Sequence, residues 1–131
     1  MTYDYELSDE IPATAQAIYD AWMSSAGHTA MTGGVAQIDT RVGATFTAWD
    51  GYIVGRTTAL EPGRRIVQSW RTADFAATDA DSQIEALLEP LPTGTRLRLL
   101  HTGVPDQLRD FEDGGWQSNY FDPMRAYFAA R

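Results

Sequence analysis

Two histidines are the side chains in this sequence whose ordinary pKa lies nearest to neutral pH, so they are the first candidates for chemistry. His101 ends an alternating run in which Leu97 and Leu99 share its face, and it should therefore point into the core. There it could hold a ligand oxygen, or act as an acid or base with a tyrosine partner. The alternative is a buried neutral imidazole, bonded to a backbone carbonyl or to a tyrosine such as Tyr120.

Other catalytic and metal-binding patterns are missing. The sequence has no cysteine, which excludes disulfides, thiolate zinc sites and cysteine nucleophiles. The second histidine, His28, has no metal-site spacing with acids such as Asp20 and Asp50. No serine lies in a Gly-x-Ser-x-Gly motif, and no glycine pair has the lysine of a phosphate-binding loop. We expect no such catalytic set, no metal and no cofactor.

Carboxylates gather at two places without a catalytic spacing. Asp79 and Asp81 flank a segment that should be an exposed loop. Asp110, Glu112 and Asp113 crowd the start of the last helix, where negative charge is favourable. Solvation and helix capping are the expected roles of both groups.

Aromatic side chains are concentrated in the closing stretch from Val104 to Arg131. They recur there at helical spacing, so one face of a long helix should be buried. These rings either fill a core or, with strand residues opposite them, line a cavity; Trp49 and Tyr52 are further candidates for that wall. The expected ligand-binding residues are Phe46, Ala48, Ile53, Gly55, Trp70, Leu99, His101, Trp116, Tyr120 and Met124.

The N-terminal part of the chain predicts a strand followed by two short helices. Residues from Tyr3 to Leu7 alternate between apolar and acidic side chains, as in a strand with one wet face. Pro12 can begin a helix, which should stop near Gly27, with a further helical turn over residues 28–32.

The middle of the chain predicts a meander of antiparallel strands. A two-residue turn at Asp50-Gly51 would pair Phe46 with Gly55. A two-residue turn at Pro62-Gly63 would then place Trp70 opposite the same glycine, so that a large ring faces an empty position.

The last third of the chain predicts two more strands and the final helix. An exposed loop over residues 72–81, with Phe75 turned towards the sheet, precedes strands at 82–89 and 95–101. Arg96 and Arg98 should point away from the core. In the helix, Gly114 and Gly115 predict an irregular start, and Pro123 predicts a kink over residues 119–122.

Composition limits the class of protein. With 131 residues, of which 44% are hydrophobic, the chain is expected to form one domain over residues 1–131. A net charge of -8, with no lysine, opposes binding to nucleic acid and to anionic membranes. No apolar stretch approaches the roughly 20 residues that span a bilayer, and no signal peptide is recognisable, so we expect a cytoplasmic protein.

The order of elements predicts an α+β helix-grip fold, in which a curved antiparallel sheet wraps a long C-terminal helix and two short helices follow the first strand. The sequence also resembles the bacterial members of the Hsp90 ATPase activator homologue family, in the START-like or Bet v 1-like superfamily. The similar pieces are Ile11-Pro12, Arg41-Val-Gly43 with Phe46, Gly55 with residues 62–70, residues 95–105, Gly115-Trp116 and residues 120–124.

The resemblance implies a fold and several functions. The leading interpretation is a binding protein for a small apolar or amphipathic ligand, held between the sheet and the last helix with His101, Tyr120 and Trp116 as polar contacts. One alternative is an enzyme, similar to some START-like cyclases and hydratases, that uses His101 and Tyr120 as acid and base.

Another alternative is an Hsp90-type co-chaperone or other interaction module, which would use the outer sheet face around Arg96 and Arg98. The family's co-chaperones carry an additional N-terminal domain, whereas this sequence starts at the helix-grip domain, so this interpretation ranks behind ligand binding. The sequence leaves open whether the protein forms a homodimer.

Overall fold

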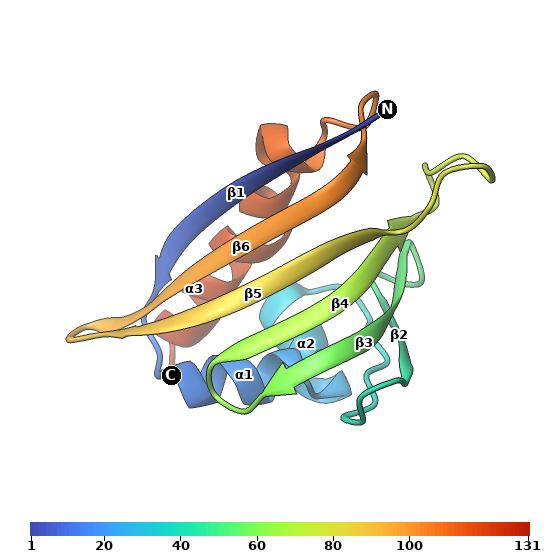
Figure 1. Cartoon of the computed structure of the whole chain (residues 1–131). Helices are drawn as coiled ribbons and strands as arrows, with labels where there is room; N and C mark the ends of the chain where they lie inside the picture. Colours follow the sequence, from blue (N-terminus) through green and yellow to red (C-terminus); the bar gives the residue numbers. More distant parts are fainter.

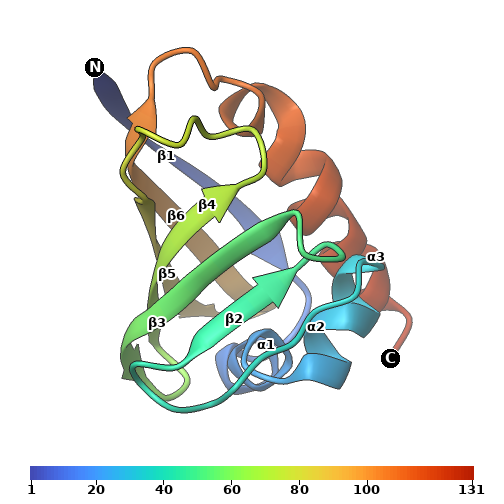
Figure 2. The same ribbon diagram turned by 90° about the vertical axis from the view of Figure 1, so that its right-hand side faces the viewer.

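One six-stranded antiparallel sheet organises the structure, a computed structural model that describes residues 1–131. The strands lie in the order β1-β6-β5-β4-β3-β2, so the first and last strands of the chain are neighbours. Figures 1 and 2 show the sheet curving around the helices, which all lie on its inner face. The strands are β1 (Thr2–Ile11), β2 (Thr45–Ala48), β3 (Ile53–Glu61), β4 (Arg65–Thr72), β5 (Ser82–Leu91) and β6 (Gly94–Pro105).

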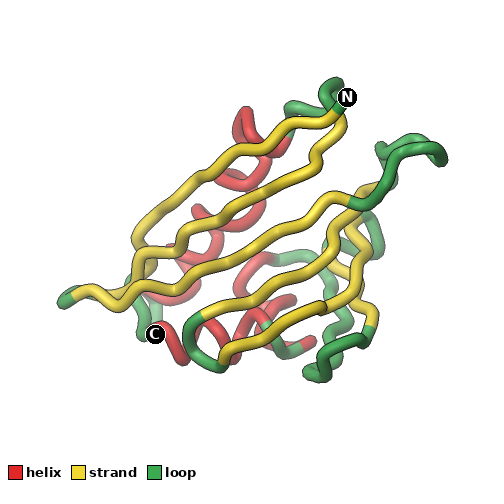
Figure 3. The backbone as a smooth tube through the Cα atoms, viewed as in Figure 1, coloured by secondary structure: helices red, strands yellow, loops and turns green.

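The helices fall into two groups along the chain. One pair follows β1, and the C-terminal helical segment follows β6, as the tube in Figure 3 shows. This is the α+β helix-grip arrangement that the sequence predicts, with two short helices after the first strand. The helices are α1 (Ala15–Trp22), α2 (Ser25–Thr32), the π-helical turns η1 (Phe111–Gly115) and η2 (Gln117–Phe121), and α3 (Asp122–Ala129).

The first helix pair breaks earlier than predicted. Helix α1 begins after Thr14, whose hydroxyl caps it, and Ser24 caps α2 in the same way. The expected stop at Gly27 is therefore wrong, because this glycine lies inside α2. A Cβ atom there would lie 2.7 Å from the Ala21 Cα atom, so the glycine allows the two helices to pack closely.

The β2–β3 hairpin has the predicted register. Ala48 pairs with Ile53, and Phe46 pairs with Gly55. The alternating pattern of the sequence therefore places these four residues on one face of the sheet.

The β3–β4 connection reaches the predicted register by a different route. Glu61 pairs with Arg65, so the turn has three residues instead of two. The longer turn offsets the pairing by one residue from the predicted register, and a register shift after Thr57 removes this offset. Continuing the pairing on either side then puts Trp70 opposite Gly55, as predicted.

The C-terminal helix is shorter and less regular than predicted. Val104 still belongs to β6, and helical structure begins at Phe111. The irregular start is confirmed, because Gly114 has a φ of 133°. The predicted kink over residues 119–122 is replaced by π-type hydrogen bonding. The backbone stays helical there, and Pro123 lies in the first turn of α3, where its missing N–H is tolerated.

The core fills the space between the sheet and the helices. Phe75 leaves the loop after β4 to pack against Trp70, with ring centroids 6.4 Å apart, as predicted. None of the helices has the length and apolarity needed to cross a membrane.

Candidate functional site

His101 lies inside a buried aromatic cluster. Strand β6 presents it on the inner face together with Leu99, and both residues are fully buried, as predicted. Its ring centroid is 4.6 Å from that of Trp70, 5.3 Å from Tyr5 and 5.7 Å from Trp116. The histidine thus joins three strands and the C-terminal helix at one point.

Both ring nitrogens of His101 have hydrogen-bond partners. The Ser82 hydroxyl donates to the Trp70 carbonyl oxygen at 2.6 Å. Its only proton is thereby used, so its Oγ must accept from Nε2 of His101 at 2.9 Å. Nδ1 accepts from the Tyr5 hydroxyl at 2.8 Å and from the Trp116 indole N–H at 3.2 Å. This geometry assigns the neutral tautomer with a proton on Nε2.

Burial keeps this imidazole neutral. It lowers the pKa of His101 to about 3 and raises the pKa of Tyr5 well above its ordinary value. A proton on Nδ1 would also lose the two bonds that this nitrogen accepts. The site therefore matches the buried neutral imidazole considered above, with Tyr5 instead of Tyr120 as the tyrosine partner.

A second histidine–tyrosine pair links α2 to the C-terminal helix. Nδ1 of His28 donates to the Trp22 carbonyl oxygen at 2.9 Å, so Nε2 accepts from the Tyr120 hydroxyl at 2.8 Å. Burial lowers the pKa of His28 to about 4 and raises that of Tyr120. The expected pairing of His101 with Tyr120 is wrong, because each of these residues has a different partner.

The residues expected to line a pocket are closely packed. The ring of Phe46 covers Gly55, where an added Cβ atom would lie 2.6 Å from the ring and would overlap the Ser69 carbonyl oxygen. The empty position predicted opposite Trp70 is therefore filled. The other predicted residues are also buried: Ala48, Ile53, Trp70, Leu99, Trp116, Tyr120 and Met124 in the hydrophobic core cluster, and His101 as a buried polar residue.

An open groove lies between the β2–β3 hairpin and the start of the C-terminal helical segment, which approach each other in Figure 2. Its volume is about 390 Å³. Polar side chains and one glycine share the lining with three aromatic rings. The lining residues are Trp49, Tyr52, Asp110, Phe111, Gly115 and Asn119.

A small inner cavity of about 20 Å³ lies between this groove and the histidine. It shares Tyr52, Asp110 and Phe111 with the groove and reaches Trp70 and His101. A water molecule needs roughly 10–15 Å³ of such space, so the inner cavity has room for about one. A larger ligand would reach the histidine only after a side chain moves.

Phe111 lies between the two spaces together with Tyr52 and Asp110, which also line both. Its ring is 4.9 Å from Trp70 and 5.4 Å from Trp116, and it is half-buried. The chain just after it is irregular, since Asp113 and Gly114 have non-helical dihedral angles. The barrier between groove and core thus includes a ring on an irregular turn.

Several residues of this site escaped the sequence analysis. Tyr5 lies directly opposite His101 because β1 pairs with β6, a long-range contact that periodicity does not reveal. Ser82 begins a predicted strand, but its bond to the histidine depends on the β5–β6 register. The sequence does contain an indication of Phe111, which precedes Trp116 in the aromatic-rich closing stretch.

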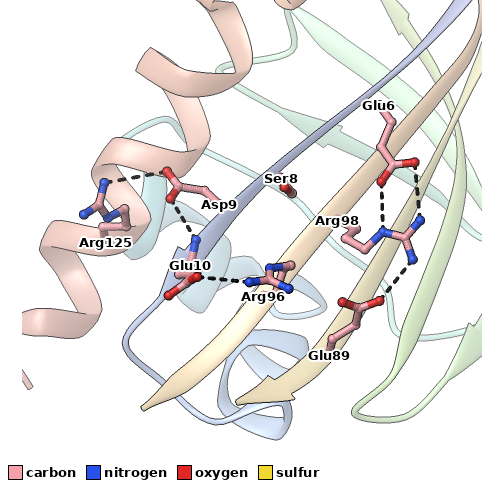
Figure 4. Close-up of a pocket in the computed structure, with 8 residues that line it drawn as sticks. All are labelled: Glu6, Ser8, Asp9, Glu10, Glu89, Arg96, Arg98 and Arg125. Atoms are coloured by element: carbon pink, nitrogen blue, oxygen red, sulfur yellow. Dashed lines mark hydrogen bonds and ion pairs between the residues drawn. The ribbon is translucent and has the colours of Figure 1, made fainter. Parts of the chain in front are cut away.

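The outer face of the sheet carries a hollow of about 760 Å³ crossed by ion pairs (Figure 4). Arg98 bonds Glu6 at 2.9 Å and Glu89 at 3.0 Å, and Arg96 bonds Glu10 at 3.1 Å. Both arginines point away from the core, as predicted. No group of three or more histidine, cysteine or acidic side chains in the structure could hold a metal ion.

Comparison with protein families gives a match over nearly the whole chain. Residues 12–129 match the family described as "Activator of Hsp90 ATPase homolog 1-like protein". An uncharacterized protein of Schizosaccharomyces pombe is 27% identical over 127 residues, which are 97% of this chain and 38% of the relative. A Dictyostelium discoideum protein named "Activator of 90 kDa heat shock protein ATPase homolog" is 24% identical over 98% of this chain and 33% of its own length. The chain thus spans about a third of the length of these relatives.

Solved structures share the fold at low sequence identity. An Hsp90 activator from Plasmodium falciparum superposes with a TM-score of 0.86 at 20% identity, covering 97% of this chain and 96% of that one. CalU16 from Micromonospora echinospora gives a TM-score of 0.79 at 21% identity, covering 98% of this chain and 77% of that one. These similarities establish the architecture and leave the site to be interpreted from its own residues.

Proposed function

Because the chain belongs to the family of Activator of Hsp90 ATPase homolog 1-like proteins, we propose that it binds a small apolar or amphipathic molecule in the groove beside the β2–β3 hairpin. The observation that carries this proposal is a groove of about 390 Å³ with three aromatic rings, separated from the buried core by Phe111. Ligand pockets in proteins typically have volumes of about 300–1,000 Å³ and similar linings.

Displacement of Phe111 would extend the groove into the core. The ligand would then contact Trp70 and His101, which border the inner cavity. Both nitrogens of that histidine are already bonded, so the geometry supports a wall of a binding site more than an acid or base. We therefore place binding ahead of catalysis.

A fluorescence titration tests this proposal. The neutral probe N-phenyl-1-naphthylamine should bind the wild-type protein with increased emission, because the groove removes it from water. Asn119→Phe adds a ring to the groove wall and should weaken binding by about tenfold or more. Ser118→Phe is the matched control, since Ser118 is exposed on the same helical turn and does not line the groove.

The titration has a clear negative outcome. Equal binding by the two phenylalanine variants, or no binding by the wild type, would refute the groove as the ligand site. A circular dichroism spectrum of each variant would verify that the fold is retained.

A second candidate function is contact with an Hsp90-type chaperone, which is favoured by the names of the Dictyostelium and Plasmodium relatives. We propose the outer sheet face for this contact, where Arg96 and Arg98 lie among acidic side chains (Figure 4). Such exposed charged pairs contribute little to folding and can form new pairs with a partner.

Calorimetry with a purified Hsp90 would test the second candidate. The double substitution Arg96→Glu and Arg98→Glu should abolish the binding heat, while Arg64→Glu, outside this hollow, should leave it unchanged. Absence of any binding heat with the wild-type chain would exclude a direct contact of this kind.

A further inference from the structure

We infer that the groove beside the β2–β3 hairpin selects organic cations, meaning small molecules with an apolar body and a protonated or quaternary amine. This inference rests on the proposed binding function and adds the charge class of the ligand. It combines two carboxylates that form no ion pair and aromatic rings on which no arginine stacks.

Two carboxylates stand beside Tyr52 where the groove meets the inner cavity. Asp74 accepts a hydrogen bond from the Tyr52 hydroxyl at 2.6 Å. Asp110 lines both the groove and the inner cavity. Burial raises the pKa of Tyr52, and the hydrogen bond to Asp74 raises it further.

Neither carboxylate has its charge neutralised by a partner. Asp110 precedes the first turn of the C-terminal helical segment, but its side chain makes no capping bond, contrary to the sequence-based expectation. Neither Asp74 nor Asp110 forms an ion pair. The nearby arginines are engaged with other acids: Arg71 with Asp81, and Arg109 with Asp106 and Glu112.

No arginine stacks on the aromatic rings of the groove. Elsewhere in the protein, arginines stack on Tyr3, Phe75 and Tyr127. No such contact occurs on Trp49, Tyr52 or Phe111. All three rings line the groove with Asp110, and Tyr52 and Phe111 also line the inner cavity with Asp74. An ammonium group held near a ring face and a carboxylate is attracted by both.

Trp49 contributes a partly buried ring to the groove wall. Its Nε1 is the one buried side-chain nitrogen or oxygen in the structure that has no hydrogen-bond partner. Because this nitrogen is out of contact with solvent, Trp49 contributes to the groove through its ring alone. The groove therefore suits a ligand with an amine and an apolar body.

Three ligands with the same body separate charge selectivity from simple apolar binding. 4-Phenylbutylamine is cationic at neutral pH, 4-phenylbutanol is neutral and 4-phenylbutyrate is anionic. Their affinities are measured by displacement of N-phenyl-1-naphthylamine and by calorimetry at about 0.15 M salt. We expect the amine to bind roughly tenfold more tightly than the alcohol, and the carboxylate to bind most weakly.

Charge-neutral variants assign the effect to the groove. In the double variant Asp74→Asn and Asp110→Asn, the preference for the amine over the alcohol should disappear while the alcohol still binds. Asp20→Asn is the control, because it removes a carboxylate on α1 that does not line the groove. It should keep the preference, which separates the groove from the attraction of the net charge of -8.

The outcomes distinguish the two proposals. Equal binding of amine and alcohol to the wild type would overturn cation selectivity and leave the binding function standing. A preference that survives in the double variant would also overturn it, because the attraction would then come from the whole protein. Failure of the alcohol and of the neutral probe to bind would refute the proposed function itself.

Discussion

Acidification from about pH 7.5 to about pH 5 should destabilise the fold through its two histidines. Burial lowers the pKa of His28 to about 4 and that of His101 to about 3, from an ordinary value of 6.5. At a pH between the folded and the unfolded pKa, the unfolded chain binds protons that the folded chain does not bind. The free energy of unfolding therefore falls as the pH falls. Each histidine should lose about 2 kcal/mol over this range, which gives about 4 kcal/mol in total.

This loss is large compared with the roughly 5–15 kcal/mol that stabilises a typical domain. It can be measured by urea unfolding followed by circular dichroism at the two pH values. His28→Gln and His101→Gln should each remove about half of the pH dependence, whatever they do to stability at neutral pH. The chain has no other histidine, so the double variant should show nearly equal stability at both pH values.

Carboxylates contribute little in this range because their ordinary pKa values lie near 4. A wild-type protein with the same free energy of unfolding at both pH values would refute the assignment of two buried neutral histidines. A double variant that keeps the full pH dependence would show that other groups cause it.

Two substitutions test the packing around the same cluster. Trp116→Phe removes the indole N–H that donates to His101 and Tyr5, and should lower the free energy of unfolding by about 1–3 kcal/mol in urea titrations; no change would mean that these bonds are dispensable. Gly55→Ala should cost about 2 kcal/mol or more, because the added methyl group overlaps the Ser69 carbonyl oxygen and the Phe46 ring; an unchanged unfolding midpoint would show that the strands can separate there freely.

Much of the fold could be predicted because local periodicity determines which side chains share a face. The alternation around His101 placed it in the core, and the Asp-Gly turn fixed the pairing of Phe46 with Gly55. The glycine pair at 114–115 correctly marked an irregular start of the last helix. Each of these inferences depends on residues close together in the sequence.

The site was harder to predict because its contacts join distant segments. Tyr5 and His101 are 96 positions apart, and His28 and Tyr120 are 92 apart. Nothing in the local pattern of either tyrosine indicates which histidine it will bond. The same limit applies to Gly55, whose apparent vacancy is filled by a ring from the neighbouring strand.

The sequence by itself determined the helix-grip order of elements and the inward face of each main strand, because these depend on composition and short-range spacing, and its resemblance to known proteins indicated the family. The tertiary structure decided the histidine–tyrosine pairs, the packed state of the expected pocket and the groove beside Phe111. These features depend on strand register and on where the C-terminal helix meets the hairpin, which are set by packing across the whole domain.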